Sequence, residues 1–226
     1  TRTHTASYVE PAVALLTTGS FLAGGEPDIV RTPAFPLLLL PGLALGFPAE
    51  ITIALQILLS VATVWLVWRI ALTLTEDATT AGFAAGLYAL EPLSILFAST
   101  LLTETLFGFL LAVGVYLVIQ GMTTGSLAYW AGAGAAIALS TYARPISVYL
   151  PVLLALGLVL VPWRQPLRSR LSRVAVLCLV SLSLTGLWQL RNYRLTGYSG
   201  FSAISDINLY YYQAASVIAA IQDVSY

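Results

Sequence analysis

Residues 50–74 read EITIALQILLSVATVWLVWRIALTL, and this stretch decides the fold class. It carries two charged residues, Glu50 at its start and Arg69 near its end. Because an α-helix rises 1.5 Å per residue, the stretch would reach about 37 Å, more than the roughly 30 Å hydrocarbon core of a bilayer. It is therefore typical of a membrane-spanning helix.

Further apolar stretches of similar length follow along the chain. They cover residues 79–98, 101–120, 126–142, 144–162 and 171–190. The whole chain is 58% hydrophobic and 9% charged, whereas soluble domains carry roughly a quarter charged residues. The pattern predicts an all-α, polytopic integral membrane protein with about six transmembrane helices.

The segment before these spans is shorter and rich in proline. Residues 33–48, PAFPLLLLPGLALGFP, would reach only about 22 Å as a helix, so we expect an interfacial helix that does not cross the bilayer. Residues 1–32 are polar, with a short helix expected at about 7–18. We thus divide the chain into an external loop with interfacial helices (1–48), a transmembrane bundle (49–190) and an external segment (191–226).

Arginine placement orients the predicted bundle. Arg164, Arg168, Arg170 and Arg173 fall within ten residues, and the positive-inside rule makes the connection at 163–173 cytoplasmic. Counting spans back from it puts both terminal segments outside, together with the connections near 99–100 and 143.

Most remaining polar groups then collect on the external side. They are His4, Glu10, Glu26, Asp28, Arg31, Glu104, Arg144, Arg191, Asn192 and Asp206. Charges avoid lipid and lie at helix ends in any case, but this does not explain why one side has so many. The excess indicates chemistry at the external face.

Several functional classes are excluded by composition. The formal net charge of zero leaves no basic surface for nucleic acid. The lone Cys178 excludes a disulfide framework, and the lone His4 excludes a multi-histidine metal site. Since the chain begins at Thr1 rather than Met, we expect a fragment that lacks at least a first membrane helix.

Four segments carry candidate site residues, each with a simpler alternative. Arg31 would bind a phosphate at the membrane surface or anchor a helix end to lipid head groups. Glu104, about one turn inside a span, would face a cavity or a partner, or interact with the helix dipole. Glu91 lies deeper, beside Pro92. Arg144, before Pro145, would pair with Glu104, bind a lipid-linked phosphate or snorkel to the interface.

The fourth segment follows the last span. Residues 188–215 begin WQLRNYRLTGY, and Trp188, Arg191 and Asn192 form an aromatic and basic anchor. The same segment also offers polar groups for a sugar or a pyrophosphate. Because the chain has no Lys, an Arg must hold any phosphate, and we expect Arg144 or Arg191 to do so, with Arg31 second.

In order, these segments resemble the C-type membrane glycosyltransferases, in particular the branch of protein mannosyltransferases and aminoarabinose transferases. The resemblance rests on the Tyr8 to Ala12 step, RTPAFP, PLSILFASTLLTETLF, ARP and WQLRNYRLTGY. It covers nearly the whole chain. It implies inverting transfer of a sugar from a polyprenyl-phosphate carrier to an unknown acceptor, at the external face of a membrane such as the bacterial inner membrane.

The resemblance also implies the site residues. Glu104 falls at the family's second acidic position, and His4 stands where the family has an Asp, four residues before Tyr8. The implied catalytic residues are Glu104, His4 and Asp28. The implied substrate-binding residues are Tyr8, Arg31, Glu91, Arg144, Arg191 and Asn192. No protein metal site is implied, and a divalent cation is left open.

A second function class remains, a transporter or a catalytically inactive membrane subunit of similar architecture. Transporters keep ionisable groups near the bilayer midplane on broken helices, and here only Glu91 lies near that depth. The external clustering of polar groups favours the enzyme, whereas His4 at the Asp position favours the inactive subunit.

Overall fold

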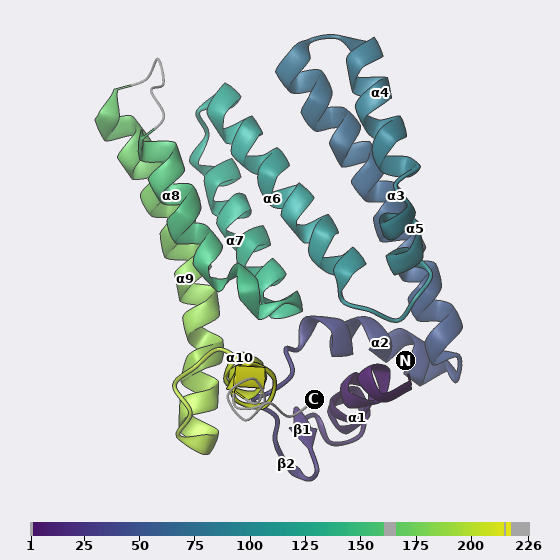
Figure 1. The fold of residues 1–226 in the computed structure, drawn as a ribbon. Helices are drawn as coiled ribbons and strands as arrows, with labels where there is room; N and C mark the ends of the chain where they lie inside the picture. Colours follow the sequence, from purple (N-terminus) through teal and green to yellow (C-terminus); the bar gives the residue numbers. More distant parts are fainter. Residues whose placement is uncertain (1, 161–165, 215, 218–226) are drawn as a thin grey trace.

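A computed structural model describes residues 2–160, 166–214 and 216–217, and its fold is all-α, as predicted (Figure 1). The row of bundle helices consists of α4 (Ala78–Ala89), α3 (Pro48–Thr75), α6 (Glu104–Thr124), α7 (Leu127–Ala143) and α9 (Leu167–Thr196). The other helices are α1 (Arg2–Thr18), α2 (Ala34–Leu45), α5 (Pro92–Ala98), α8 (Leu150–Leu160) and α10 (Ile204–Asn208). A 3₁₀ turn, η1 (Pro145–Tyr149), precedes α8, and a π turn, η2 (Leu209–Ala214), follows α10.

The bundle packs in a row in which α3 contacts α4 and α6, α6 contacts α7, and α7 contacts α9. Its buried centre lies between α6, α7 and α9 and contains Trp130, Ile137 and Leu177. A Cβ on Gly134 would lie 2.4 Å from the carbonyl oxygen of Leu177, so only glycine permits this close approach of α7 to α9. Small residues at helix contacts are typical of packing in membranes, where close backbone approach provides the attraction.

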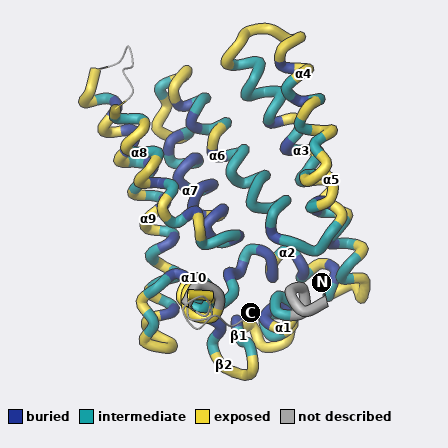
Figure 2. Tube along the Cα trace, viewed as in Figure 1, coloured by how far each residue is buried: buried dark blue, intermediate teal, exposed yellow. Residues whose placement is uncertain are grey.

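Three helices, α3, α6 and α9, are long and apolar enough to cross a membrane. A fourth span is added if α4 and α5, which bend by 58° at Leu90 and Glu91, are taken as one. Leu58, Trp65 and Leu179 are among the large apolar side chains that remain exposed on α3 and α9. Exposed positions recur along the outer helices α4 and α9, where the tube in Figure 2 is yellow. Such surfaces suit contact with lipid rather than water.

The prediction of about six spans is not confirmed by helix length. Helices do form in all six predicted segments, but α7 has 17 residues and would reach only about 25 Å. The fifth segment is divided between η1 and the 11-residue α8. Residues 161 and 162 at its predicted end lie outside the described residues.

The first segment contains two short helices and a hairpin. Helix α1 begins at Arg2 rather than near residue 7. Its first turns are only weakly apolar, so the sequence showed no hydrophobic periodicity that would have predicted a helix there. Ala12 of α1 packs against Phe35 and Leu39 of α2, and both helices run across the end of the bundle (Figure 1). At 12 residues α2 is short, as expected; its interfacial position stays a prediction.

Between α1 and α2, strands β1 (Leu22–Ala23) and β2 (Glu26–Pro27) form an antiparallel hairpin. Its turn residues Gly24 and Gly25 both have positive φ, as a tight two-residue hairpin turn requires. The carboxylate of Glu10 accepts a hydrogen bond from the Gly24 N–H at 2.6 Å, which ties the hairpin to α1.

The helices α1, α2 and α10 lie at one end of the bundle, and the end of α8 and the start of α9 lie at the other (Figure 1). Arg168, Arg170 and Arg173 belong to the first turns of α9 rather than to a loop, and Arg164 lies outside the described residues. Arg170 donates to the carbonyls of Leu158, at 3.4 Å, and Val159 at the end of α8. A cation at a helix C-terminus stabilises that end.

Candidate active site

A cavity of about 610 Å³ opens at the end of the bundle that carries α1, α2 and α10. Its walls come from segments far apart in the sequence: Tyr8, residues 30–32, Thr103, residues 143–146 and 148–149, Gln189, Tyr198, residues 200–202, Ile204, Asp206 and Asn208. The cavity therefore lies where the predicted external loops meet the ends of the bundle helices that the sequence analysis also places outside.

Hydrogen bonds between residues 29–30 and residues 202–203 close one wall of this cavity. Ser202 Oγ donates to the carbonyl of Val30 at 2.6 Å, and the N–H of Ala203 donates to the carbonyl of Ile29 at 2.9 Å. These bonds span more than 170 residues of sequence, so they fix two distant segments against each other.

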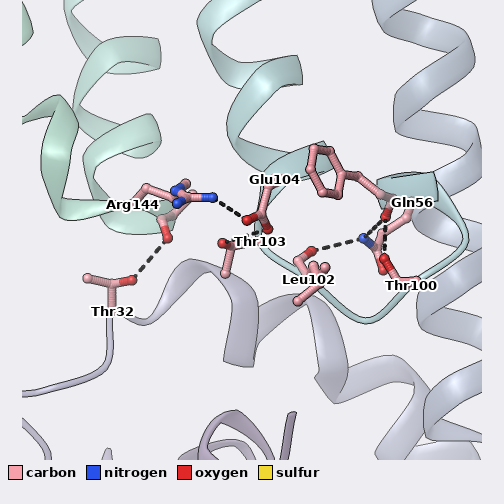
Figure 3. A network of polar contacts seen from close by, with 9 residues as sticks. Thr32, Gln56, Thr100, Leu102, Thr103, Glu104 and Arg144 are labelled. Atoms are coloured by element: carbon pink, nitrogen blue, oxygen red, sulfur yellow. Dashed lines mark hydrogen bonds and ion pairs between the residues drawn. The ribbon is translucent and has the colours of Figure 1, made fainter. Parts of the chain in front are cut away.

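The ion pair of Glu104 and Arg144 lies at the edge of the cavity (Figure 3). Glu104 begins α6, Arg144 follows the last residue of α7, and their Oε1 and Nη1 atoms are 2.5 Å apart. Thr103 Oγ1 donates to the other carboxylate oxygen at 3.3 Å. Arg144 and Thr103 line the cavity, whereas Glu104 stands beside them. The sequence had allowed this pairing as one of three roles for Arg144.

Arg31 is the second cation in the cavity wall. Its guanidinium lies over the Tyr8 ring, 4.9 Å from the centroid, and Tyr8 in turn packs edge-on against Phe35. The carboxylate of Asp28 accepts the N–H groups of Val30, at 2.7 Å, and Arg31, at 3.0 Å, which shapes the turn that presents Arg31. Within the described part of the chain Arg31 has no acidic partner, so its charge is available.

Arg191 and Asn192 belong to a structural joint, whose hydrogen bonds connect α9 to the first segment and to residues 200–201. Arg191 donates to the carbonyls of Asp28, at 2.7 Å, and Phe21, at 2.8 Å, and to Asn192 Oδ1 at 3.0 Å. Asn192 is fully buried and donates to the carbonyls of Gly200 and Phe201. Neither residue lines the cavity, and Asp28 is also buried outside it. These predicted site residues hold the walls in position.

Two further predicted residues do not contribute described side chains to the cavity. Glu91 caps α5, where its carboxylate accepts the N–H groups of Leu93 and Ser94, and it stands at the α4–α5 bend rather than in the cavity wall. His4 belongs to α1, but its side chain lies outside the described part of the structure.

The structure adds a carboxylate that sequence reasoning had noted only as an external charge. Asp206 is the one acidic side chain among the described cavity-lining residues, and its Oδ2 accepts the Tyr198 hydroxyl at 2.8 Å. Burial, together with this carboxylate, raises the pKa of Tyr198 to about 12, so the hydroxyl stays a donor at neutral pH. Spacing could not reveal the pair, since it depends on how the 198–208 segment folds back.

The described residues contain no group of three or more His, Cys, Asp or Glu side chains that could hold a metal ion. The polar chemistry available in the described cavity is therefore two guanidinium groups, one carboxylate, hydroxyls and amides. This set suits an anionic, hydroxyl-rich ligand.

Comparison with known protein families gives one match, and no curated protein and no solved structure matches. The family described as dolichyl-phosphate-mannose-protein mannosyltransferase matches residues 30–188, more than two thirds of the chain. The matched region contains Arg31, Glu104 and Arg144, and it ends before Arg191. The apolar helices and this match show a membrane glycosyltransferase-like protein: the chain belongs to the dolichyl-phosphate-mannose-protein mannosyltransferase family.

Proposed function

We propose that this protein transfers a sugar from a polyprenyl-phosphate carrier to an acceptor in the cavity between α1, α7 and α10. The observation that carries the proposal is the pair of cavity-lining cations, Arg31 and Arg144, at the end of an apolar bundle. A lipid-linked phosphate needs apolar surface for its tail and cations for its head group, and this end of the molecule offers both.

The two arginines would stabilise the leaving phosphate. When the bond between the sugar C1 and the phosphate oxygen breaks, negative charge grows on that oxygen, and a preorganised cation beside it lowers the barrier. Arg144 is oriented by Glu104 and Arg31 by the Tyr8 ring. Arg191, an equal candidate from sequence, is less suited because its guanidinium already binds two carbonyls and an amide oxygen.

The acceptor would attack C1 from the face opposite the phosphate, which inverts the configuration there. A new bond forms from C1 to the acceptor oxygen, the bond to the phosphate breaks, and the acceptor proton must move to a base. We assign this base to Asp206, because it is the carboxylate in the described cavity wall. Glu104 then acts through Arg144, as a positioning residue.

Donor binding tests this function. We expect purified protein in detergent to bind a polyprenyl-phosphate sugar, and Arg144→Ala or Arg31→Ala to weaken that binding about tenfold, as loss of a charge-assisted contact implies. Arg194→Ala is the matched control, since Arg194 is exposed at the same end and does not line the cavity. Unchanged binding in both cavity variants would contradict the phosphate site, and a wild-type protein that binds no such lipid would favour a transporter or an inactive subunit.

We further propose that the cavity faces outward, as in a bacterial inner-membrane enzyme, because the arginine-rich start of α9 lies at the opposite end. In a Cys178→Ala background, a cysteine at Ser199 should react with an impermeant thiol reagent in intact cells, and one at Ser169 should not. The opposite labelling pattern would reverse the orientation and contradict the outward site.

A further inference from the structure

Gln56 is a fully buried amide in the first third of the apolar helix α3. Its Nε2 donates to two carbonyls, that of Phe97 at 3.2 Å and that of Leu102 at 2.9 Å (Figure 3). These carbonyls stand at the two ends of the connection between α5 and α6, residues 99–103. One side chain therefore bridges both ends of this connection.

An amide at this position is not explained by packing. Its Oε1 has no hydrogen-bond partner among the described residues, and burying an unpaired polar atom is unfavourable. An apolar side chain would fill the same space without that penalty. What the amide adds is its pair of bonds to the connection, which join α3 to a segment more than 40 residues later.

The connection leads directly into the candidate site. Thr103, the residue after Leu102, lines the cavity, and Glu104, which follows, holds Arg144. Thr103 precedes α6 without a side-chain capping bond, so no local cap fixes the start of this helix. Besides the ion pair of Glu104 with Arg144, the bond from Gln56 to Leu102 is a polar contact from another helix to the residue directly before Thr103.

We propose that Gln56 is a positioning residue for sugar transfer: by holding the 99–103 connection, it sets where Thr103 and Glu104 stand and hence where Arg144 points. This inference rests on the proposed function. It predicts a larger effect on the chemical step than on donor affinity, because Arg144 keeps its charge in the cavity and Arg31 does not depend on this connection. Small misplacements of reacting groups can reduce rates about a hundredfold.

The first test compares Gln56→Met, which keeps the shape of the side chain and removes its N–H donors, with substitutions of two other buried residues of α3. We expect kcat to fall about tenfold or more while KM for the donor lipid stays within about twofold. Thr63→Val is the matched control because Thr63 is as deeply buried in α3 but bonds only to its own helix, at the carbonyl of Leu59. Thr52→Val removes a buried hydroxyl that has no described partner, and it should also leave kcat unchanged.

A double variant shows whether the effect passes through Glu104. In the Glu104→Gln background, Gln56→Met should cause little additional loss, because residues that act in series are not additive. Full additivity of the two losses would contradict the proposed route.

The second test does not depend on activity. A nitroxide attached to a cysteine at the exposed Ser99, in a Cys178→Ala background, reports the mobility of the connection. Gln56→Met should increase that mobility, and Thr63→Val should not. Unchanged mobility, or increased mobility with unchanged kcat, would overturn the inference alone. A wild-type protein without transfer activity would instead contradict the proposed function, and with it the catalytic half of the inference.

Discussion

Arg191 and Arg144 occupy the same end of the molecule but different environments. The joint, formed by Phe21, Asp28, Arg191 and Asn192, directs the Arg191 donors at backbone carbonyls and an amide oxygen. At the cavity edge, Arg144 has a carboxylate partner and lines open space, with its side chain 39% exposed. Arg144 follows the last residue of α7 and Arg191 lies within α9, and only Arg144 lines the cavity where it could contact a ligand.

The difference shows that the surroundings of an arginine determine whether it stabilises the fold or can bind a ligand. A guanidinium that satisfies buried carbonyls fixes the fold, because removing it leaves those acceptors unpaired. A partly exposed guanidinium held by one carboxylate contributes little stability, since ion pairs open to solvent are worth about 0–1 kcal/mol. Substitution should therefore affect stability in the joint and ligand binding at the cavity edge.

The largest expected effect on stability is that of Arg191→Ala. It leaves the carbonyls of Phe21 and Asp28 without their partner, and each such loss costs about 1–3 kcal/mol, so we expect about 3 kcal/mol in total. Thermal unfolding in detergent measures the change, with Arg194→Ala as the control. An unchanged melting temperature, or a donor-binding defect in otherwise stable protein, would remove the distinction between the two arginines.

The smallest expected effect is the loss of donor affinity when the Tyr8 ring beneath the Arg31 guanidinium is removed. Tyr8→Leu removes a cation–π contact worth about 0.5–1 kcal/mol at an exposed site, which corresponds to a two- to fivefold loss of donor affinity. Tyr8→Phe keeps the ring and should bind normally. Equal binding by the Leu and Phe variants would show that the ring does not orient Arg31, whereas a loss in both would assign the role to the hydroxyl.

Much of the fold could be predicted because long apolar stretches leave few alternatives to membrane helices. The grouping of Arg31, Glu104 and Arg144 was also accessible, since counting spans puts all three at one end. The number of spans was not, because the bend at Glu91 divides the second apolar segment, and the fourth and fifth segments form helices of 17 and 11 residues.

What sequence could not supply were contacts between distant segments. The bonds from Arg191 to residues 21 and 28 depend on how the first segment folds across α9. The position of Asp206 depends likewise on the return of the 198–208 segment. Gln56 did carry a signal, as the single amide in the apolar stretch 50–74, and an isolated polar side chain in a span usually has a specific partner.

The central claim, that this cavity transfers a sugar from a lipid-linked phosphate, is tested most directly by the transfer rate of Glu104→Gln. This change keeps the shape of the side chain and removes the charge that orients Arg144. We expect wild-type protein to transfer the sugar and the variant to lose about a hundredfold in rate, while it folds and binds donor lipid normally. Transfer at the wild-type rate by well-folded Glu104→Gln protein would contradict the account.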